Sequence, residues 1–166
     1  MKSVYNFVVT PKGDRYNNKK EIDGGELILN TEIFNHQYVN REAIVISKPI
    51  VGETDIKAGD TVVVHHNVFR RWHNVKGEEK NSRSYFNEST YMIAPDQIFL
   101  YKRDDKWNCP KGYCFVMPLK EKNPLNVDLE KPLQGIVKYS DGTVKVNDLV
   151  GFRPSSEYEF VIDGER

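Results

Sequence analysis

One short pattern occurs twice in the chain, and it constrains the fold more than any other feature of the sequence. The pattern is V/I-K-x-G/N-D-x-V, and it occupies Ile56–Val62 and again Val144–Val150. Gly59 and Asn147 stand at the same place in it, and both residue types tolerate the positive φ of a tight turn. The repeat therefore predicts two turns that each lead into an aliphatic β-strand.

Upstream segments match in the same order. Ala43–Val45 aligns with Gly135–Val137, and Phe7–Pro11 aligns with Phe115–Pro118. Three matches in one order indicate tandem copies of a single folding unit.

Short β-type runs separated by Gly, Pro, Asn and Asp make up most of the chain, and no window has a convincing helical period. This organisation is typical of an all-β barrel or sandwich. The polar, turn-prone stretch Lys102–Lys111 lies between the two copies, so we expect domains at 1–104 and 112–166. The expected strands are Val4–Thr10, Ala43–Ile46, Thr61–Val64, Tyr91–Ile93, Ile98–Tyr101, Tyr113–Met117, Gly135–Tyr139, Leu149–Phe152 and Tyr158–Ile162.

A long polar segment, about residues 12–41, separates the first two expected strands. It contains a glycine pair and three aliphatic residues, namely Gly24, Gly25, Leu27, Ile28 and Leu29. Loops of this length without secondary structure are generally functional or disordered, and we interpret this one as a mobile arm with a hydrophobic hook. The alternative is that Glu26–Leu29 forms one more short strand, with the glycines marking its turn.

Composition narrows the class of partner. The chain has 166 residues, of which 39% are hydrophobic, and its formal net charge is zero because 24 basic residues balance 24 acidic ones. A zero net charge provides no general attraction to nucleic acid or to an anionic membrane, which favours a protein partner. The sequence shows no export signal and no apolar run of membrane-spanning length, so we expect a soluble, cytoplasmic protein. The spacing of Cys109 and Cys114 fits neither a zinc pair nor a CxxC redox motif, which leaves the thiols as small hydrophobic residues.

No catalytic or cofactor-binding motif stands out, and we expect neither enzymatic activity nor a cofactor. His65 and His66 invite a metal site, but neighbours in a strand point to opposite faces, so surface histidines are the favoured interpretation and no metal is expected. A basic and aromatic cluster could bind a nucleic-acid strand, although Glu78 and Glu79 interrupt it and favour a solvated loop. The cluster consists of Arg70, Arg71, Trp72, Lys76, Lys80, Arg83, Tyr85 and Phe86.

The order of these segments resembles the GroES co-chaperonin family over roughly the first 100 residues. The residues that carry the resemblance are Phe7–Val9, Gly24-Gly25 with Leu27-Ile28-Leu29, Ala43–Val45, Asp55–Val62, and Tyr91–Ile93 leading to Asp96–Leu100. The resemblance implies two tandem GroES-like β-barrels, of which the second is degenerate or incomplete. The connection Ser47–Thr54 is shorter than the family's roof hairpin, and the second copy reaches Arg166 before any equivalent of Tyr91–Tyr101. We therefore expect a second barrel that stays open, or an incomplete sequence.

The function that the resemblance implies is that of a co-chaperonin. A homo-oligomeric ring would cap a GroEL-like chaperonin, which hydrolyses ATP, and Gly24, Gly25, Leu27, Ile28 and Leu29 would form the chaperonin-binding site. Its location would be the cytoplasm, or the host cytoplasm for a viral protein. An enzyme of the medium-chain dehydrogenase type would need a dinucleotide-binding half, for which the chain has neither the length nor the glycine fingerprint. A viral structural or nucleic-acid-binding β-barrel module without chaperonin activity is the remaining alternative.

Overall fold

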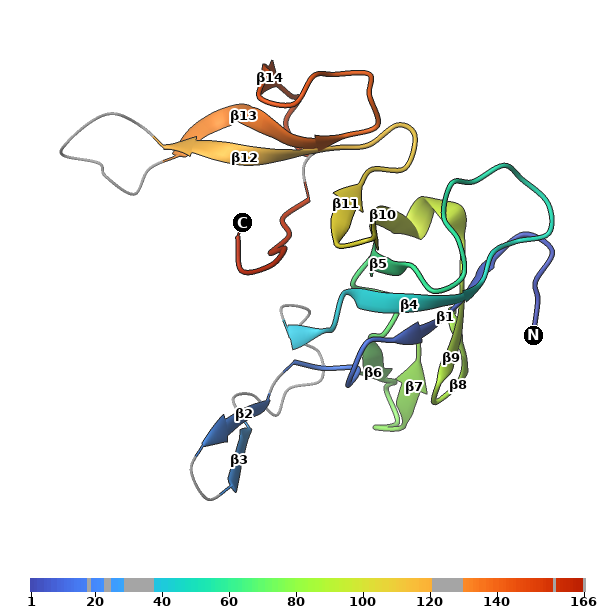
Figure 1. Ribbon diagram of the computed structural model, residues 1–166. Helices are drawn as coiled ribbons and strands as arrows, with labels where there is room; N and C mark the ends of the chain where they lie inside the picture. Colours follow the sequence, from blue (N-terminus) through green and yellow to red (C-terminus); the bar gives the residue numbers. More distant parts are fainter. Residues whose placement is uncertain (18, 23–24, 29–37, 121–129, 157, 166) are drawn as a thin grey trace. The chain divides into compact units, whose positions relative to one another are not determined.

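The computed structural model describes residues 1–17, 19–22, 25–28, 38–120, 130–156 and 158–165. The protein is all-β and is built from antiparallel sheets (Figure 1). This confirms the predicted class, but none of the sheets in the described ranges closes into a barrel, so the two expected barrels are not found there. The chain divides into two compact units, Met1–Pro110 and Lys111–Arg166.

The first unit contains a seven-stranded sheet with the order β11-β10-β5-β4-β1-β9-β8. Two hairpins pair separately from it, β2 with β3 and β6 with β7. A 3-10 turn, η2 (Pro95–Gln97), precedes β10. The strands of this unit are β1 (Phe7–Pro11), β2 (Lys19–Ile22), β3 (Gly25–Ile28), β4 (Glu42–Ser47), β5 (Thr61–Val64), β6 (Arg71–His73), β7 (Glu79–Asn81), β8 (Tyr85–Asn87), β9 (Thr90–Ile93), β10 (Ile98–Arg103) and β11 (Lys106–Asn108).

The core of the first unit follows from the alternation of side chains along its strands. In β4, Ala43 and Val45 are buried while Ile44 and Ile46 are exposed, as expected for a strand with one face on the core. Tyr91 packs edge-to-face on Phe69 with ring centroids 4.7 Å apart. The other members of this buried cluster are Phe7, Val9, Tyr16, Val39, Ile56, Val62, Val64, Val68, Ile93, Ile98 and Tyr101.

The second unit is a three-stranded sheet of β12 (Cys114–Lys120), β13 (Glu130–Ser140) and β14 (Leu149–Gly151), in that order. Phe160, from the segment after β14, lies against Phe115 with ring centroids 5.4 Å apart. The predicted strand Tyr158–Ile162 is wrong. Ile162 makes only an isolated bridge to Glu165, because this stretch pairs with no neighbouring strand in the described part of the chain.

The strands β1, β4 and β5 and the strands β12, β13 and β14 have the same arrangement. Both pairs are irregular in register at the same place, between Val8 and Val9 in β1–β4 and between Phe115 and Val116 in β12–β13. The β12–β13 pair has a second irregularity, between Pro118 and Lys120. The structural equivalent of Phe115 is therefore Val8, one residue later than the sequence alignment suggested. The matching pairs are Val9↔Val45, Thr10↔Ile44, Pro11↔Ala43 in the first unit and Val116↔Val137, Met117↔Ile136, Pro118↔Gly135 in the second.

The repeated turns also coincide in their hydrogen bonds. The amide of Gly59 donates to the carbonyl of Val45 over 2.8 Å, and the amide of Asn147 donates to the carbonyl of Val137 over the same 2.8 Å. Both residues have positive φ, +91° at Gly59 and +74° at Asn147. The predicted turn chemistry of the repeat is thus confirmed at both sites.

Candidate interaction site

The segment between β1 and β4 is held at its base by one buried side chain. Asn40 is 2% exposed, and its Nδ2 donates to the carbonyls of Lys12, at 3.0 Å, and Asp14, at 2.8 Å. Its Oδ1 accepts the backbone N–H of Glu42 at 2.9 Å. The side-chain amide of Asn40 therefore links the backbone at the start of the segment to the backbone at its end.

Two further residues fasten the base to the body of the unit. Tyr16 is buried, forms a bridge with Val39, and accepts the backbone N–H of Arg71 at its hydroxyl over 2.8 Å. Arg15 donates to the carbonyl of Phe69 through Nε at 3.3 Å and Nη2 at 3.1 Å. The guanidinium of Arg15 also lies 5.5 Å from the ring centroid of Tyr91, a cation–π distance. These contacts hold the base against the rest of the first unit. No sequence motif predicted them.

A cleft of about 360 Å³ lies beside this base and is lined by charged residues of both signs. Arg15 and Arg71 bring two positive charges, and Asp14 and Glu88 bring two negative ones. The charges balance, so the cleft offers no net field for an ionic ligand. Pro11, Gly13 and Tyr16 complete its lining.

Beyond the base, the segment contains a β-hairpin that pairs only with itself in the described residues (Figure 1). In its register, Lys19 faces Ile28 and Lys20 faces Leu27. The expectation of an arm without secondary structure is therefore wrong over β2 and β3, and the alternative of an additional short strand is confirmed for Gly25–Ile28.

The structure describes three of the five predicted binding residues. Gly25, Leu27 and Ile28 lie in β3. Gly24 and Leu29 lie outside the described residues. The hairpin thus brings Leu27 and Ile28 into one strand of a two-stranded sheet, separate from the seven-stranded sheet of the same unit.

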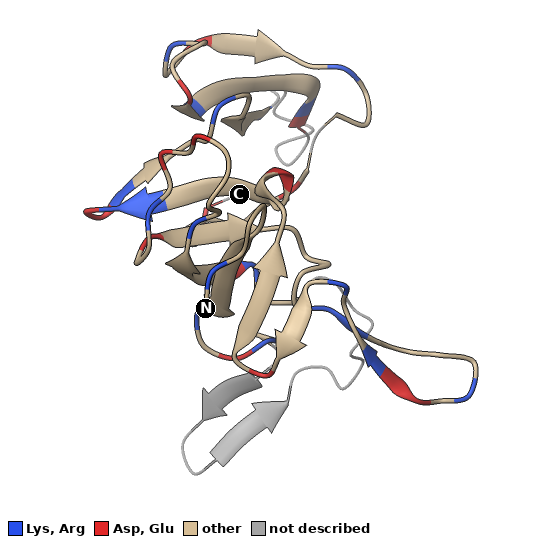
Figure 2. Ribbon diagram, turned by 90° about the vertical axis from the view of Figure 1, so that its right-hand side faces the viewer, with Lys and Arg blue, Asp and Glu red and all other residues tan. Residues whose placement is uncertain are grey.

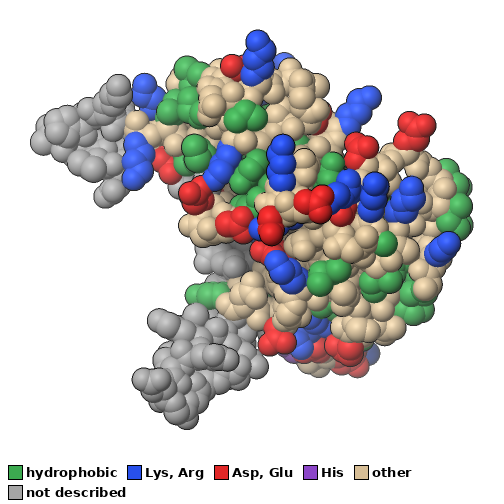
Figure 3. Space-filling view, in the orientation of Figure 1, with side chains coloured by type: hydrophobic (Ala, Val, Ile, Leu, Met, Phe, Trp, Pro, Cys, Tyr) green, Lys and Arg blue, Asp and Glu red, His purple; other side chains and the backbone are tan. Residues whose placement is uncertain are grey.

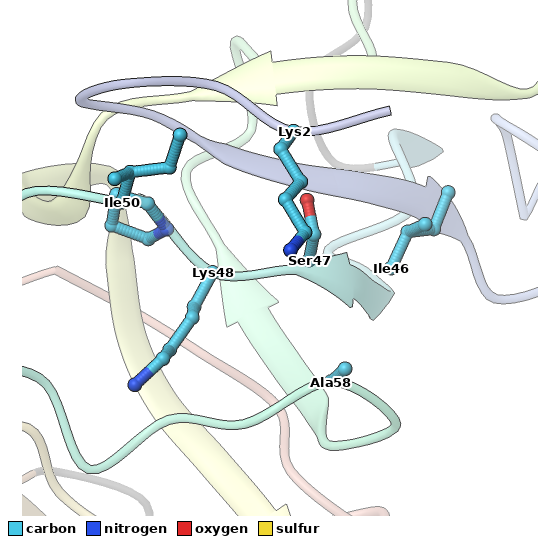
Figure 4. A pocket seen from close by; sticks show the side chains of 7 residues that line it. Lys2, Ile46, Ser47, Lys48, Ile50 and Ala58 are labelled. Atoms are coloured by element: carbon cyan, nitrogen blue, oxygen red, sulfur yellow. The ribbon is translucent and has the colours of Figure 1, made fainter.

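A second, shallow hollow of about 400 Å³ lies where β4 ends (Figure 4). Its lining includes the apolar side chains of Ile46, Ile50 and Ala58 and the long side chains of Lys2 and Lys48. Residues 48–60 form turns and no strand, in keeping with the short connection seen in the sequence. The hollow contains no acid–base pair that would point to a reaction.

The basic and aromatic cluster proves to be electrostatically paired. Nη1 of Arg71 lies 3.3 Å from Oε1 of Glu79, and Nζ of Lys80 lies 3.0 Å from Oε2 of Glu78. Figure 2 shows basic and acidic residues interleaved along the described ribbon. Trp72 is nevertheless 44% exposed on the β6–β7 hairpin. Phe86 of the same cluster is 55% exposed, so the cluster has two accessible rings, but its cations are partly neutralised.

The two neighbouring histidines lie closer together than strand alternation predicted. Their ring centroids are 4.2 Å apart because β5 ends at Val64, so His65 and His66 follow the strand instead of belonging to it. Burial, followed by the charge of Arg41, lowers the pKa of His65. No group of three or more potential metal-binding His, Cys, Asp or Glu residues occurs in the described ranges. Of the two thiols, Cys109 is buried and Cys114 is exposed.

The molecular surface mixes charges of both signs with hydrophobic side chains on the face seen in Figure 3. The described part of the chain contains no helix with the length and apolar character needed to cross a membrane. Comparison with protein-family models, with curated protein sequences and with solved structures gave no match.

Proposed function

We propose that the protein is a co-chaperonin that binds a GroEL-like chaperonin through the β2–β3 hairpin. The observation that carries the proposal is the hairpin itself: it is a separate sheet inserted between β1 and β4, and its base is fastened by Asn40. An inserted element of this kind can present Leu27 and Ile28 to another molecule without disturbing the sheet that carries it.

The energetics favour several weak contacts over one strong contact. Burial of Leu27, Ile28 and Leu29 in a partner groove contributes about 1.5–3 kcal/mol for each side chain. Ordering the backbone costs about 1–2 kcal/mol per residue, but the pairing of β3 with β2 meets part of that cost before binding. One hairpin therefore binds weakly and reversibly.

Assembly into a homo-oligomeric ring supplies the remaining affinity. Once one hairpin is bound, the others experience a high effective concentration, and avidity rises by about 10² to 10⁴ without any new contact. The weak individual contact also allows release when the chaperonin changes conformation as it hydrolyses ATP.

The substitution Ile28→Asp tests the proposal, because a charge in the hydrophobic groove is costly. We expect native mass spectrometry with a GroEL-type tetradecamer and nucleotide to detect a complex of the unaltered chain, and the variant to bind at least about 100-fold more weakly. Val75→Asp is the matched control, because Val75 is fully exposed on the other hairpin and should leave binding unchanged. Circular dichroism checks that both variants stay folded.

Two results would refute the proposal. One is the absence of any complex with the unaltered chain, and the other is full binding by a folded Ile28→Asp variant. The viral nucleic-acid-binding alternative instead predicts a salt-dependent affinity for single-stranded nucleic acid, which a titration at two salt concentrations measures in the same preparation.

A further inference from the structure

The two copies of the repeat, β1-β4-β5 and β12-β13-β14, differ at the outer edge of their third strand. In the first unit that strand is β5, and β10 pairs antiparallel with its outer edge through Leu100↔Val63, Tyr101↔Val62 and Lys102↔Thr61. In the second unit the equivalent strand is β14, which pairs with β13 on one side and with no strand on the other in the described part of the chain. Within the residues that the structure describes, the edge that is covered in one copy is therefore open in the other.

Backbone groups on this open edge point away from β13. The carbonyl of Asp148 accepts the N–H of Val137 at 3.0 Å, and the N–H of Phe152 donates to the carbonyl of Leu133 at 3.1 Å. Antiparallel strands alternate the direction of their hydrogen bonds, so Leu149 and Gly151 present their N–H and C=O groups outward. Leu149 is also 63% exposed, which leaves this edge accessible.

The two copies differ in one charge interaction at this edge. In the first unit, Asp60 is 6% exposed, and Arg103 at the end of β10 donates to its carboxylate through Nε at 3.0 Å and through Nη2. The equivalent Asp148 is exposed, and its carboxylate accepts only the backbone N–H of Lys145, at 3.3 Å, among the contacts of the described residues. The open edge therefore carries a carboxylate whose counterpart in the first unit is held by a guanidinium.

We propose that the β14 edge binds an extended segment of a partner protein that adds to the sheet as an antiparallel strand and places an arginine opposite Asp148. The backbone groups of Leu149 and Gly151 would supply the hydrogen bonds, and Asp148 would supply charge selectivity. The first unit provides the geometry, because β10 makes this same addition to β5 within one chain.

A second copy of the chain does not meet this requirement through its own β14. When two β14 strands pair about a twofold axis, a residue whose backbone groups point outward must face another residue of that kind. Leu149 and Gly151 are such residues and have odd numbers, so the numbers of any two facing residues add up to an even number. Asp148 would then face Phe152 or Pro154 and not Arg153. Charge complementarity therefore selects a segment of different sequence.

The experiment uses the full chain and a labelled peptide with the sequence of Ile98–Arg103, whose binding is followed by fluorescence anisotropy. We expect saturable binding to the unaltered chain. Gly151→Pro removes an outward N–H and should weaken binding about tenfold, whereas proline leaves the bonds to β13 in place. Asp148→Asn should weaken binding about two- to fivefold, with Asp104→Asn as a neutral control, and a peptide carrying Arg103→Glu should lose a similar factor.

Hydrogen exchange of β12 and β13 in the Gly151→Pro variant separates a blocked edge from an unfolded unit. If those strands keep their protection and the peptide binds as before, the proposal is overturned. The absence of peptide binding to the unaltered chain overturns it too. A dimer in sedimentation experiments that Gly151→Pro abolishes would assign the edge to a second copy and refute the partner that we infer.

Discussion

Asn40 and Asp60 are buried polar side chains in the first unit. Each makes hydrogen bonds to two separate parts of the chain and so holds the local backbone in place. Asn40 both donates and accepts, so its amide satisfies backbone groups on either side of the inserted segment. Asp60 accepts the N–H of Lys57 at 2.8 Å within its own turn and also pairs with Arg103 from β10. Buried polar groups of this kind stabilise only when their partners are complete.

Asn40→Ala should lower the free energy of unfolding of the first unit by about 2–4 kcal/mol, because it removes three hydrogen bonds between a buried amide and the backbone of Lys12, Asp14 and Glu42. Asn40→Asp keeps the acceptor for Glu42 but places a buried carboxylate oxygen against the carbonyl oxygens of Lys12 and Asp14, so it should destabilise at least as much as Asn40→Ala. Urea denaturation followed by tryptophan fluorescence measures both. Equal stability of all three proteins would contradict the role of Asn40 in the base.

The ion pair of Asp60 predicts a pH dependence of stability. Burial by itself raises the pKa of Asp60, but hydrogen bonds from Arg103 and Lys57 outweigh it, and the pKa lies below its ordinary value of 3.8. The stabilisation is therefore fully present above about pH 4 and is lost as the pH falls through the lowered pKa. Asp60→Asn should cost about 1–3 kcal/mol at neutral pH and flatten this acid dependence. Denaturation at pH 6 and at pH 3 measures this dependence. Asp148→Asn is the control and should change stability much less, because the carboxylate of Asp148 has no guanidinium partner among the described residues.

The central strands of the two copies, β4 and β13, differ in the space that they leave for one side chain. Ala43 in β4 and Gly135 in β13 are structurally equivalent, and both are buried. A Cβ at Gly135 would lie 2.9 Å from the carbonyl oxygen of Met117 and 2.9 Å from Cβ of Val116. At this position the second copy leaves no room for the Cβ that Ala43 carries in the first copy.

Gly135→Ala should destabilise the second unit by about 1–3 kcal/mol, because the clash involves backbone that cannot move without breaking the β12–β13 pairing. The matched substitution Ala43→Gly removes a methyl group from the first unit and should cost about 1 kcal/mol. Hydrogen exchange resolved by mass spectrometry assigns each effect to its own unit. An unchanged exchange rate in β12 and β13 of Gly135→Ala would contradict the prediction, because it would show that the backbone accommodates the added Cβ without loss of stability.

For the whole molecule, the two units differ in how much apolar surface they bury. The first unit contains the large core around Tyr91 and Phe69. In the described part of the second unit, Val137 is the only hydrophobic side chain with an exposed fraction near zero. Since burial supplies most of the stabilising free energy, the second unit has much less to oppose its conformational entropy.

The amides of β12, β13 and β14 should therefore exchange with deuterium faster than those of β1, β4 and β5, although the hydrogen-bond pattern is the same in both sets. A binding partner at the β14 edge should slow the exchange in the second unit alone. Exchange measured with and without the peptide of Ile98–Arg103 checks both statements. Equal protection of the two sets in the free protein would contradict the dependence on core size.

The sequence determined the elements in which local chemistry and side-chain alternation agree. Thr61–Val64 was predicted with its observed bounds, and the turns at Gly59 and Asn147 follow from residue types that accept positive φ. The polar strands were missed, because β2, β6, β7, β8 and β11 lack an aliphatic alternation and form only through pairing with a neighbour. Tyr158–Ile162 failed for the opposite reason, since it has the alternation but pairs with no strand among the described residues.

Only the tertiary structure decided which edges are covered and which side chains hold the base of the hairpin. The role of Asn40 depends on carbonyls that lie 26 and 28 residues away, and no local pattern encodes such a distance. The same turn sequence leads to a buried Asp60 in one copy and an exposed Asp148 in the other, because β10 covers the edge of β5 and brings Arg103 to Asp60. No strand of the described residues covers the outer edge of β14 in this way. Local sequence sets what a strand can pair with, whereas the arrangement of the whole chain sets whether a partner is there.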